Sequence, residues 1–340
     1  MRKPVLAITM GDIAGVGPEI IAKAMCHTEI LDKYSPLIIG SERALRRGME
    51  FTQCSFSFRV IQSDREISNE FSGISLWNDE TYFTNHLPFQ GIDPACGAAA
   101  FSWLDRGIQL ALQKKVAAIV TAPLHKEALN KAGHHYAGHT EILADKTRTH
   151  EFSLMLIAGK FRVVHVTCHV ALSQVAPFLT PNRIISTISL FDEALSRLDE
   201  KRPRIAVCAF NPHAGEGGLF GNEELDSILP AIEHCVSEGM FVEGPFPSDS
   251  IYPQLVGGRY DGVVAMYHDQ GHIPFKLINF GFDSSTKEWG KVSGVNVTLG
   301  LPIIRTSVDH GTAFDIAGTG KASEQSLLDA IDIALKLSSN

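Results

Sequence analysis

The chain has 340 residues, of which 44% are hydrophobic and 20% are charged, and its formal net charge is −8 at pH 7. Its glycines follow no G-X-Y period, which excludes collagen-like and low-complexity proteins. An acidic balance disfavours nucleic acid or an anionic membrane as the main partner, although a locally basic pocket for a small anion stays compatible with it. The length predicts two domains, because single cores stop growing at roughly 250–300 residues.

The six cysteines indicate the compartment. The closest two, Cys208 and Cys235, are 27 residues apart, so the sequence has no C-x-x-C pair for redox chemistry or zinc. The apolar run Val5–Met10 is too short for a signal peptide. No stretch approaches the ~20 apolar residues of a membrane span. We therefore expect a soluble protein in the reducing cytoplasm.

Short β-branched runs alternate with helical patterns along the chain, which predicts an α/β protein with a largely parallel sheet. The predicted strands are Val5–Thr9, Leu37–Ile39, Phe58–Ile61, Ala117–Thr121, Phe161–Thr167, Arg204–Phe210, Gly262–Met266 and Val295–Thr298. The predicted helices are Pro18–Met25, Ala98–Gln113, Lys126–Lys131, Asn182–Leu198, Asn222–Glu238 and Glu324–Leu337. The polar, turn-rich stretch Phe282–Gly294 is predicted to be a surface loop or a hairpin.

Histidine is unusually frequent, with 14 copies, and three of them follow separate predicted strands: His169, His213 and His268. Ligands of open α/β sheets bind beyond the carboxyl ends of the strands. Three neutral imidazoles that leave positions open are a ligand set for a catalytic divalent metal. A single strand-end histidine is more often a cap or a surface residue, so the hypothesis rests on the convergence of all three.

Other polar residues lie where the same rule places ligand contacts. His139 and Thr140 open a short predicted helix, which Thr140 can cap and whose backbone N–H groups can hold an anion. Simple capping explains these two residues equally well. Lys276, Asn296 and Arg305 are candidates for binding phosphate or carboxylate, and the alternative for the two cations is a solvated surface charge.

Two glycine-rich loops lie near the ends of the chain. Gly11–Glu19 joins a predicted strand to a helix, as a phosphate or cofactor turn would, and Asp309–Lys321 is the second loop. Neither has the G-x-G-x-x-G pattern, and the first lacks the Lys-Ser/Thr of a P-loop. The sequence therefore predicts no Rossmann dinucleotide site.

Several stretches resemble the 4-hydroxythreonine-4-phosphate dehydrogenase (PdxA-like) family, which is related to isocitrate and isopropylmalate dehydrogenases. They occur in order over almost the whole chain: TMGDIAGVGPE (9–19), TAPLHK (121–126), GHTE (138–141), NPHAGEGG (211–218), YHDQGH (267–272) and GVNVTLGLPIIRTSVDHGTAFDIAGTGKA (294–322).

The resemblance implies a two-domain isocitrate/isopropylmalate dehydrogenase-like fold with mostly parallel sheets and the active site in the interdomain cleft. One domain would combine residues 1–135 and 300–340 and hold the N-terminal glycine-rich loop and the NAD loop. The central domain, 136–299, would hold the metal and substrate and mediate dimerisation. The family also implies a homodimer with its active site at the subunit interface.

The resemblance further implies an enzyme that uses NAD and one divalent metal ion: zinc, cobalt, manganese or magnesium. The sequence does not distinguish NAD from NADP. On the matched positions the metal ligands would be His169, His213 and His268. Substrate contacts would be His139, Thr140, Lys276, Asn296 and Arg305. The cofactor would lie at His310, Gly311, Asp315 and Gly318.

The implied reaction oxidises the 3-hydroxyl of a four-carbon 4-phosphorylated acid and then removes CO₂. Lys276 is the candidate proton donor or acceptor, with an electrostatic role toward substrate as its alternative. Asp249 is the candidate assisting carboxylate, with a structural role as its alternative.

The stretch Phe282–Gly294 departs from the members that make the pyridoxine precursor. It resembles the paralogous branch that acts on D-threonate or D-erythronate 4-phosphate and releases dihydroxyacetone phosphate. The alternative is the 4-phosphohydroxy-L-threonine dehydrogenase of pyridoxal phosphate biosynthesis. A three-histidine zinc aldolase or hydrolase is a remoter alternative, and a non-catalytic small-molecule binding protein is disfavoured.

Overall fold

The computed structural model describes residues 3–68, 70–71, 73–83, 86–199, 201–284 and 288–339. Its internal contacts divide the chain into two compact units. Unit 1 comprises residues 1–149 and 301–340, and unit 2 comprises residues 150–300. Unit 1 is therefore built from both ends of the chain, and unit 2 from one continuous segment.

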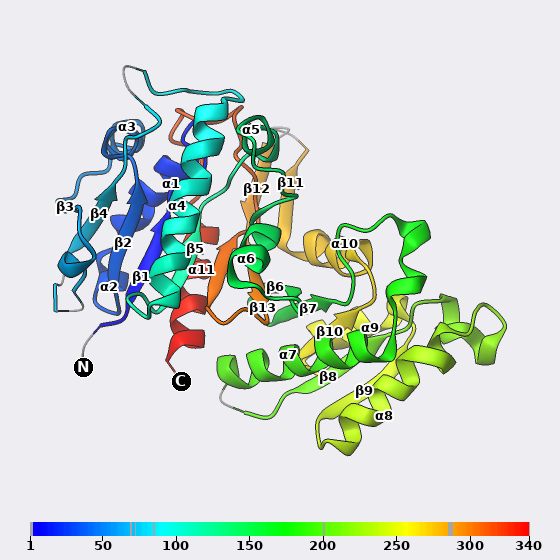
Figure 1. Cartoon of the computed structure of the whole chain (residues 1–340). Helices are drawn as coiled ribbons and strands as arrows, with labels where there is room; N and C mark the ends of the chain where they lie inside the picture. The colour runs from blue at the N-terminus through cyan, green and yellow to red at the C-terminus, as the bar shows by residue number, and fades with distance from the viewer. Residues whose placement is uncertain are drawn as a thin grey trace. The chain divides into compact units, whose positions relative to one another are not determined.

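Unit 1 contains a parallel sheet with the strand order β3-β4-β2-β1-β5-β14 (Figure 1). Its strands are β1 (Val5–Thr9), β2 (Ser35–Gly40), β3 (Phe58–Ile61), β4 (Ile74–Asn78), β5 (Ala118–Thr121) and β14 (Arg305–Val308). Every residue of β1 is buried. Its sequence VLAIT has the near-continuous apolar character of a parallel strand that is covered on both faces.

The helices of unit 1 are α1 (Gly17–Met25), α2 (Thr28–Leu31), α3 (Glu42–Thr52), α4 (Pro94–Leu112), α5 (Lys126–Lys131), α6 (His139–Thr147) and α11 (Gln325–Ser338), together with the short 3₁₀ turn η1 (Asp64–Glu66). The start of helix α6 shows that the prediction of Thr140 as its N-cap is wrong. The helix begins at His139 after Gly138, and no side chain caps it. Thr140 therefore lies inside the first turn and cannot be the N-cap, but the N–H groups of that turn point out of the helix end.

Unit 2 contains strands in the order β13-β6-β7-β10-β8-β9. They are β6 (Ser153–Ala158), β7 (Phe161–His165), β8 (Arg204–Cys208), β9 (Phe241–Phe246), β10 (Gly262–Ala265) and β13 (Val295–Leu299). Strand β6 runs antiparallel to both neighbours, and the other pairings are parallel. The predicted α/β class with a largely parallel sheet is thus confirmed.

The helices of unit 2 are α7 (Pro181–Asp199), α8 (Leu229–Ser237), α9 (Ser248–Val256) and α10 (His268–Asn279). Shorter turns are η2 (Leu172–Gln174), η3 (Ala176–Phe178), η4 (Pro212–Gly218) and the π-helical turn η5 (Glu224–Ile228). Phe275 of helix α10 is buried in the core of unit 2, where it packs with residues of β6, β7, β8 and β10. This packing fixes α10, and with it His268 at the start of the helix.

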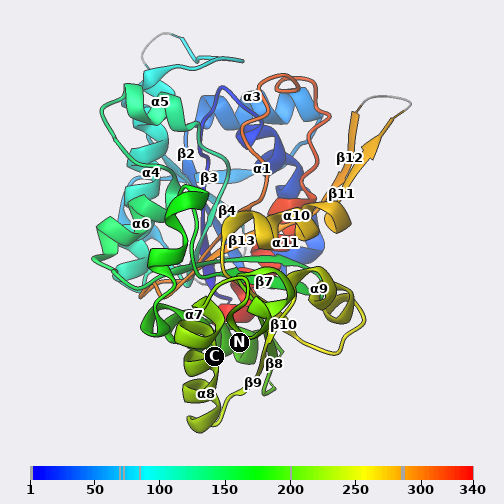
Figure 2. The same cartoon turned by 90° about the vertical axis from the view of Figure 1, so that its right-hand side faces the viewer.

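The stretch Phe282–Gly294 contains most of an antiparallel hairpin, β11 (Phe280–Asp283) with β12 (Glu288–Val292). Figure 2 shows the two strands side by side, extending from the end of α10. The hairpin prediction is confirmed for these strands, and residues 285–287 lie outside the described residues.

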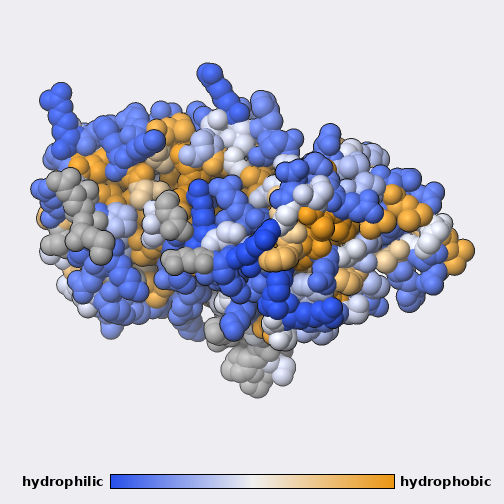
Figure 3. Space-filling model, turned by 90° about the horizontal axis from the view of Figure 1, so that it is seen from below, coloured by the Kyte–Doolittle hydropathy of each residue, from blue (hydrophilic) through white to orange (hydrophobic). Residues whose placement is uncertain are grey.

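The face of the molecule in Figure 3 is mostly polar, with apolar side chains gathered in separate areas. Interspersed apolar surface is normal for a folded protein. None of the helices within the described ranges combines the length and hydropathy needed to cross a lipid bilayer.

Candidate functional site

Two of the three predicted metal ligands lie close together in unit 2. His169 follows the end of β7, and His268 is the first residue of α10, shortly after β10. Their imidazole centroids are 6.0 Å apart. His268 Nδ1 also lies 2.7 Å from Asp269 Oδ1, a contact that restricts the orientation of the ring.

The third predicted ligand, His213, lies on the loop that follows β8. Its backbone is left-handed, with φ at 52°. The His213 imidazole lies 6.3 Å from the ring of Phe220, measured between centroids. Left-handed backbone is unfavourable for a residue with a Cβ atom, so the surrounding contacts must hold His213 in place.

The donor atoms fit a divalent metal in chemistry, since a neutral imidazole nitrogen ligates zinc, cobalt and manganese. Within the described part of this single chain, no three His, Cys, Asp or Glu side chains lie together as ligands of one ion. The chain therefore brings His169 and His268 together as a candidate pair, and the three-histidine set stays a prediction.

Two further histidines surround this pair, and sequence reasoning missed both. The His272 ring stacks on the His268 ring with centroids 3.6 Å apart, and the His165 ring lies 4.7 Å from that of His272. Burial lowers the pKa of His165 to about 4 and that of His272 to about 2, and the neighbouring imidazoles add to the effect. Both rings are therefore neutral and pack against His268. The i, i+4 spacing of His268 and His272 was the available signal.

The candidate proton-transfer residues lie on separate helices of unit 2. Lys276 is exposed on α10, with its Nζ 5.6 Å from the centre of the Phe280 ring. Asp249 is exposed in the first turn of α9. These two side chains form no ion pair with each other in the described chain. Asn296 lies on β13 opposite Leu156 and is partly buried.

Gln270 links the segments that carry these residues. Its side chain accepts a hydrogen bond from Met266 N at 2.6 Å and donates to Ala209 O and Ser248 Oγ, each at 2.7 Å. The ends of β8 and β10 and the start of α9 are thereby joined at one buried amide.

A second group of predicted residues lies together in unit 1. Arg305 opens β14, is only 3% exposed, and donates from Nη2 to Thr121 Oγ1 at 2.7 Å. Burial lowers the pKa of Arg305 to about 9, while the nearby Glu141 carboxylate acts in the opposite direction. His139 belongs to the same group: burial and the positive charges of Arg305 and Lys126 hold its pKa well below the ordinary value. A buried cation beside a neutral imidazole is suited to binding an anionic oxygen.

Thr121, Lys126 and Glu141 were not predicted as site residues, although each lies in a stretch that the family resemblance matched. Thr140 is partly buried in the first turn of α6, next to His139. The structure thus places His139, Thr140 and Arg305 within unit 1, and Lys276 and Asn296 within unit 2.

The residues predicted to bind NAD lie on the loop between β14 and α11. The buried Glu19 side chain accepts from Gly320 N at 2.9 Å and from Gly318 N, and Gln90 Nε2 donates to Ala317 O at 2.8 Å. His310 Nδ1 faces Gly311 O at 2.9 Å. Its buried Nε2 has no hydrogen-bond partner among the described residues, which fits a bound cofactor as the missing partner. Gly311 and Asp315 are exposed on this loop.

The N-terminal glycine-rich loop contains a buried carboxyl group. Asp12 Oδ1 accepts from Ala14 N at 2.9 Å, whereas Oδ2 accepts no hydrogen bond from the described chain, although the Cys96 thiol is near enough to favour the charged form. Burial raises the pKa of Asp12 to about 6. The ionised Asp12 carboxylate therefore destabilises the folded state near neutral pH.

Replacing Asp12 with asparagine is expected to stabilise the fold at pH 7. The folded pKa exceeds the unfolded one, so the folded state binds more protons between about pH 4 and 6, and the free energy of unfolding falls as pH rises through that window. Across that window the free energy of unfolding falls by at most about 3 kcal/mol. Urea unfolding at pH 4 and pH 7 measures it: D12N should show a flatter pH dependence, and exposed Asp32→Asn should match wild type. Equal slopes for D12N and wild type would contradict the prediction.

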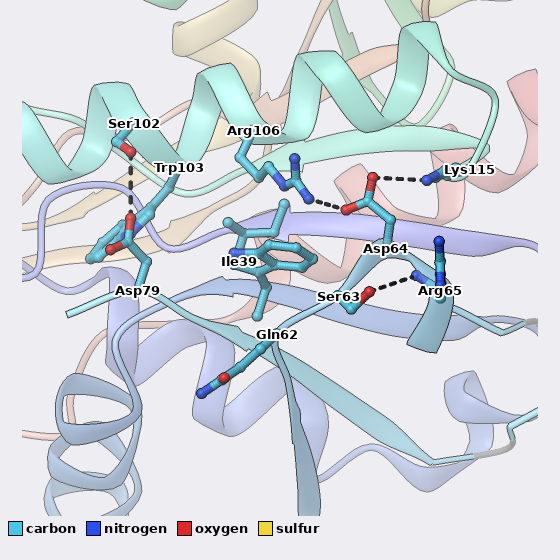
Figure 4. Close-up of a pocket in the computed structure, with 11 residues that line it drawn as sticks. Ile39, Gln62, Ser63, Asp64, Arg65, Asp79, Ser102, Trp103, Arg106 and Lys115 are labelled. Carbon is cyan, nitrogen blue, oxygen red and sulfur yellow. Dashed lines mark hydrogen bonds and ion pairs between the residues drawn. The ribbon is translucent and has the colours of Figure 1, made fainter. Parts of the chain in front are cut away.

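Unit 1 also contains a cavity of about 590 Å³ beside β2, β4 and α4. Figure 4 shows Arg106 and Lys115 directed at Asp64 on one side, and Ser102 facing Asp79 on the other. The Lys115 and Arg106 charges are thus already paired with a carboxylate. None of the predicted site residues lines this cavity.

Comparison with known proteins identifies the family. A family model described as pyridoxal phosphate biosynthetic protein PdxA matches residues 32–334. The chain belongs to the PdxA family.

The PdxA-family chain is similar to named enzymes over almost its full length. It is 45% identical to a D-threonate 4-phosphate dehydrogenase from Cupriavidus necator, over 96% of this chain and 95% of that protein. It is 43% identical to a 4-hydroxythreonine-4-phosphate dehydrogenase from Trichlorobacter lovleyi, over 98% of each. A crystal structure of 4-hydroxythreonine-4-phosphate dehydrogenase from Klebsiella pneumoniae superposes with a TM-score of 0.82 at 41% identity, covering 99% of this chain and all of that one.

Proposed function

We propose that this PdxA-family chain is an NAD-dependent dehydrogenase that oxidises the 3-hydroxyl of a four-carbon 4-phosphorylated acid and releases CO₂. D-threonate 4-phosphate, or its D-erythronate isomer, is the proposed substrate, and dihydroxyacetone phosphate the product. The positive charges of the buried Arg305 and of Lys126 near His139 support an anionic substrate, because such charges attract anionic oxygen. Relatives named as dehydrogenases of such phosphorylated acids support the reaction class.

The proposed reaction balances in two steps. A hydride leaves C3 for the nicotinamide ring of NAD while the hydroxyl proton is released, which gives a 3-keto acid and NADH. The C1–C2 bond then breaks, CO₂ leaves, and the electron pair passes into the ketone as an enolate. A proton added at C2 gives dihydroxyacetone phosphate.

The chain's own residues would bind substrate and move protons. Arg305, His139 and Thr140 would bind anionic oxygens, and Asn296 would orient a hydroxyl. Lys276 would exchange a proton with the substrate, with Asp249 assisting. When bound at His169, His213 and His268, a divalent metal would supply Lewis-acid stabilisation of negative charge on oxygen.

NAD would lie along the loop that carries His310, Gly311, Asp315 and Gly318. Two features support this proposal: the buried Nε2 of His310, which has no hydrogen-bond partner in the described part of the chain, and the hydrogen bonds from Gly318 N and Gly320 N that hold the loop against Glu19. The same features would serve NADP equally well.

Replacing Glu19 with glutamine is expected to raise the KM for NAD about tenfold, because one acceptor oxygen for the loop is lost, at roughly 1.4 kcal/mol. Steady-state NAD titration at saturating acid measures the effect, and exposed Glu29→Gln serves as the matched control. An unchanged KM for NAD in E19Q would remove Glu19 from the support of this loop.

The decisive experiment is a side-by-side NAD-reduction assay that follows the absorbance of NADH. Purified protein with a divalent metal should reduce NAD with D-threonate 4-phosphate and form dihydroxyacetone phosphate. A strong preference for 4-phosphohydroxy-L-threonine would instead assign the 2-amino substrate. No NADH with any four-carbon 4-phosphate would overturn the dehydrogenase and favour a nicotinamide-independent aldolase or hydrolase.

We also propose that the enzyme is a cytoplasmic homodimer. Exposed apolar side chains on α10, with Ile273 at 64% and Leu277 at 80%, support a subunit interface in unit 2. Six free thiols support a reducing compartment. Light scattering during gel filtration should give twice the chain mass, and a monomer at micromolar concentration would contradict the dimer.

A further inference from the structure

The loop that carries His213 has a conformation that its own sequence does not favour. Residues 213–218 all have positive φ: 52°, 55°, 76°, 47°, 66° and 100° in order. His213, Ala214 and Glu216 are not glycine, and this backbone conformation is unfavourable for an L-residue. Contacts outside the loop must offset this strain.

One buried carboxylate lies against this loop. Glu224 is 3% exposed and accepts hydrogen bonds from Phe210 N at 2.8 Å and Asn211 N at 2.7 Å through Oε1. Its Oε2 accepts from Asn211 Nδ2 at 2.9 Å. The backbone that leads into the left-handed turn is thereby anchored just before His213.

The same carboxylate also lies close to the turn itself. A Cβ atom added at Gly215 would lie 2.7 Å from Glu224 Oε2, so only glycine permits this approach. Gly215 O closes the turn by accepting from Phe220 N at 3.2 Å. Glu224 is also the first residue of the π-helical turn η5, a rare irregularity that is frequent at functional sites.

We propose that Glu224 is the positioning residue of His213: its side chain holds the left-handed loop in the single conformation that presents the imidazole. The role assigned to His213 in catalysis rests on the proposed function, whereas the support of the loop by Glu224 does not. Glutamine at this position keeps one acceptor oxygen for the two backbone N–H groups, but it loses the negative charge and places an NH₂ donor against Asn211 Nδ2. The anchoring contacts would therefore be weakened while side-chain volume is preserved.

The first test compares Glu224→Gln with Glu223→Gln by amide hydrogen exchange of residues 213–218 in the protein without ligands. Glu223 is a matched control, because it accepts from the same Asn211 Nδ2 at 2.7 Å but from none of the backbone N–H groups. Exchange should become at least tenfold faster in E224Q and stay as in wild type in E223Q. Equal protection in all three proteins would overturn the proposal.

The second readout is kinetic. E224Q should lower kcat at least tenfold while the KM for NAD is unchanged, since the NAD loop belongs to unit 1. Adding Ala214→Gly should restore part of the lost kcat, because glycine adopts the left-handed backbone without strain. A double mutant no better than E224Q, with a wild-type melting temperature, would show that Glu224 acts otherwise.

A third variant tests the proposal if E224Q does not fold. If E224Q yields little folded protein, Asn211→Ala removes only the side-chain bonds to Glu223 and Glu224, and loop exchange should rise about threefold; unchanged exchange would count against the proposal. If wild type reduces no NAD with any acid tested, the proposed function fails while the exchange comparison still decides the role of Glu224.

Discussion

Alanine at position 213 is expected to lower kcat/KM for the phosphorylated acid at least about 10³-fold. The proposed metal contributes several kcal/mol of charge stabilisation, and about 4 kcal/mol corresponds to that loss. Alanine keeps the Cβ atom, so the left-handed backbone at φ 52° has the same strain and the fold should be unaffected. Initial rates of NADH formation measure the effect, together with the affinity for added Co²⁺.

Exposed His234→Ala is the matched control for this variant, because it removes an imidazole from α8 in the same unit. Its rates and melting temperature should equal those of wild type. Wild-type activity in H213A would remove His213 from the proposed ligand set.

Replacing Arg305 with methionine should lower kcat/KM for the acid by about 10³-fold, mainly through KM. Two charge-assisted hydrogen bonds to an anionic group, at roughly 2 kcal/mol each, account for this loss. The variant also removes the hydrogen bond to Thr121 and a positive charge near Glu141, so its melting temperature is measured beside the kinetics.

Arg305→Lys separates charge from geometry. Lysine keeps a positive charge but lacks the planar guanidinium. The kcat/KM of R305K for the acid should therefore lie between those of wild type and R305M. The KM for NAD should stay constant in both variants. A wild-type KM for the acid in R305M would show that the anion binds elsewhere.

Local patterns predicted the exact bounds of three elements, β1, β3 and α5. β1 (VLAIT) and β3 (FRVI) are rich in residues that favour strands, and α5 follows His125, whose side chain caps the helix start. The strand-end rule also selected His169 and His268, whose rings lie 6.0 Å apart. Parallel strands deliver their carboxyl ends to one edge, so this proximity follows from topology.

Other elements depend on contacts that no short window contains. β4, β6, β9 and β14 were missed as strands, and α2, α3, α9 and α10 as helices. α10 contains Gly271 and Pro274, which local propensity disfavours, yet Phe275 is fully buried in the core of unit 2. The packing of one side chain outweighs the local preference.

The residues that hold the candidate site in place were the least predictable. Glu19 and Glu224 each accept backbone N–H groups from a glycine-containing loop. Such partners are distant in sequence or hidden in irregular turns, and nothing about an isolated glutamate distinguishes a buried acceptor from a solvated charge. Only the three-dimensional contacts separate the two.

The division of unit 1 between both chain ends affects the order of events during synthesis. Unit 2 is one continuous segment, 150–300, so it is complete in the nascent chain while β14 and α11 have not yet been translated. Domains generally fold as units as they emerge. In the sheet of unit 1, β5 is an unpaired edge strand until β14 pairs with it. Arg305 is the first residue of β14, so it joins the sheet at the same step. The proposed anion site is therefore assembled last, and a chain truncated before residue 301 would expose an unpaired strand edge prone to aggregation.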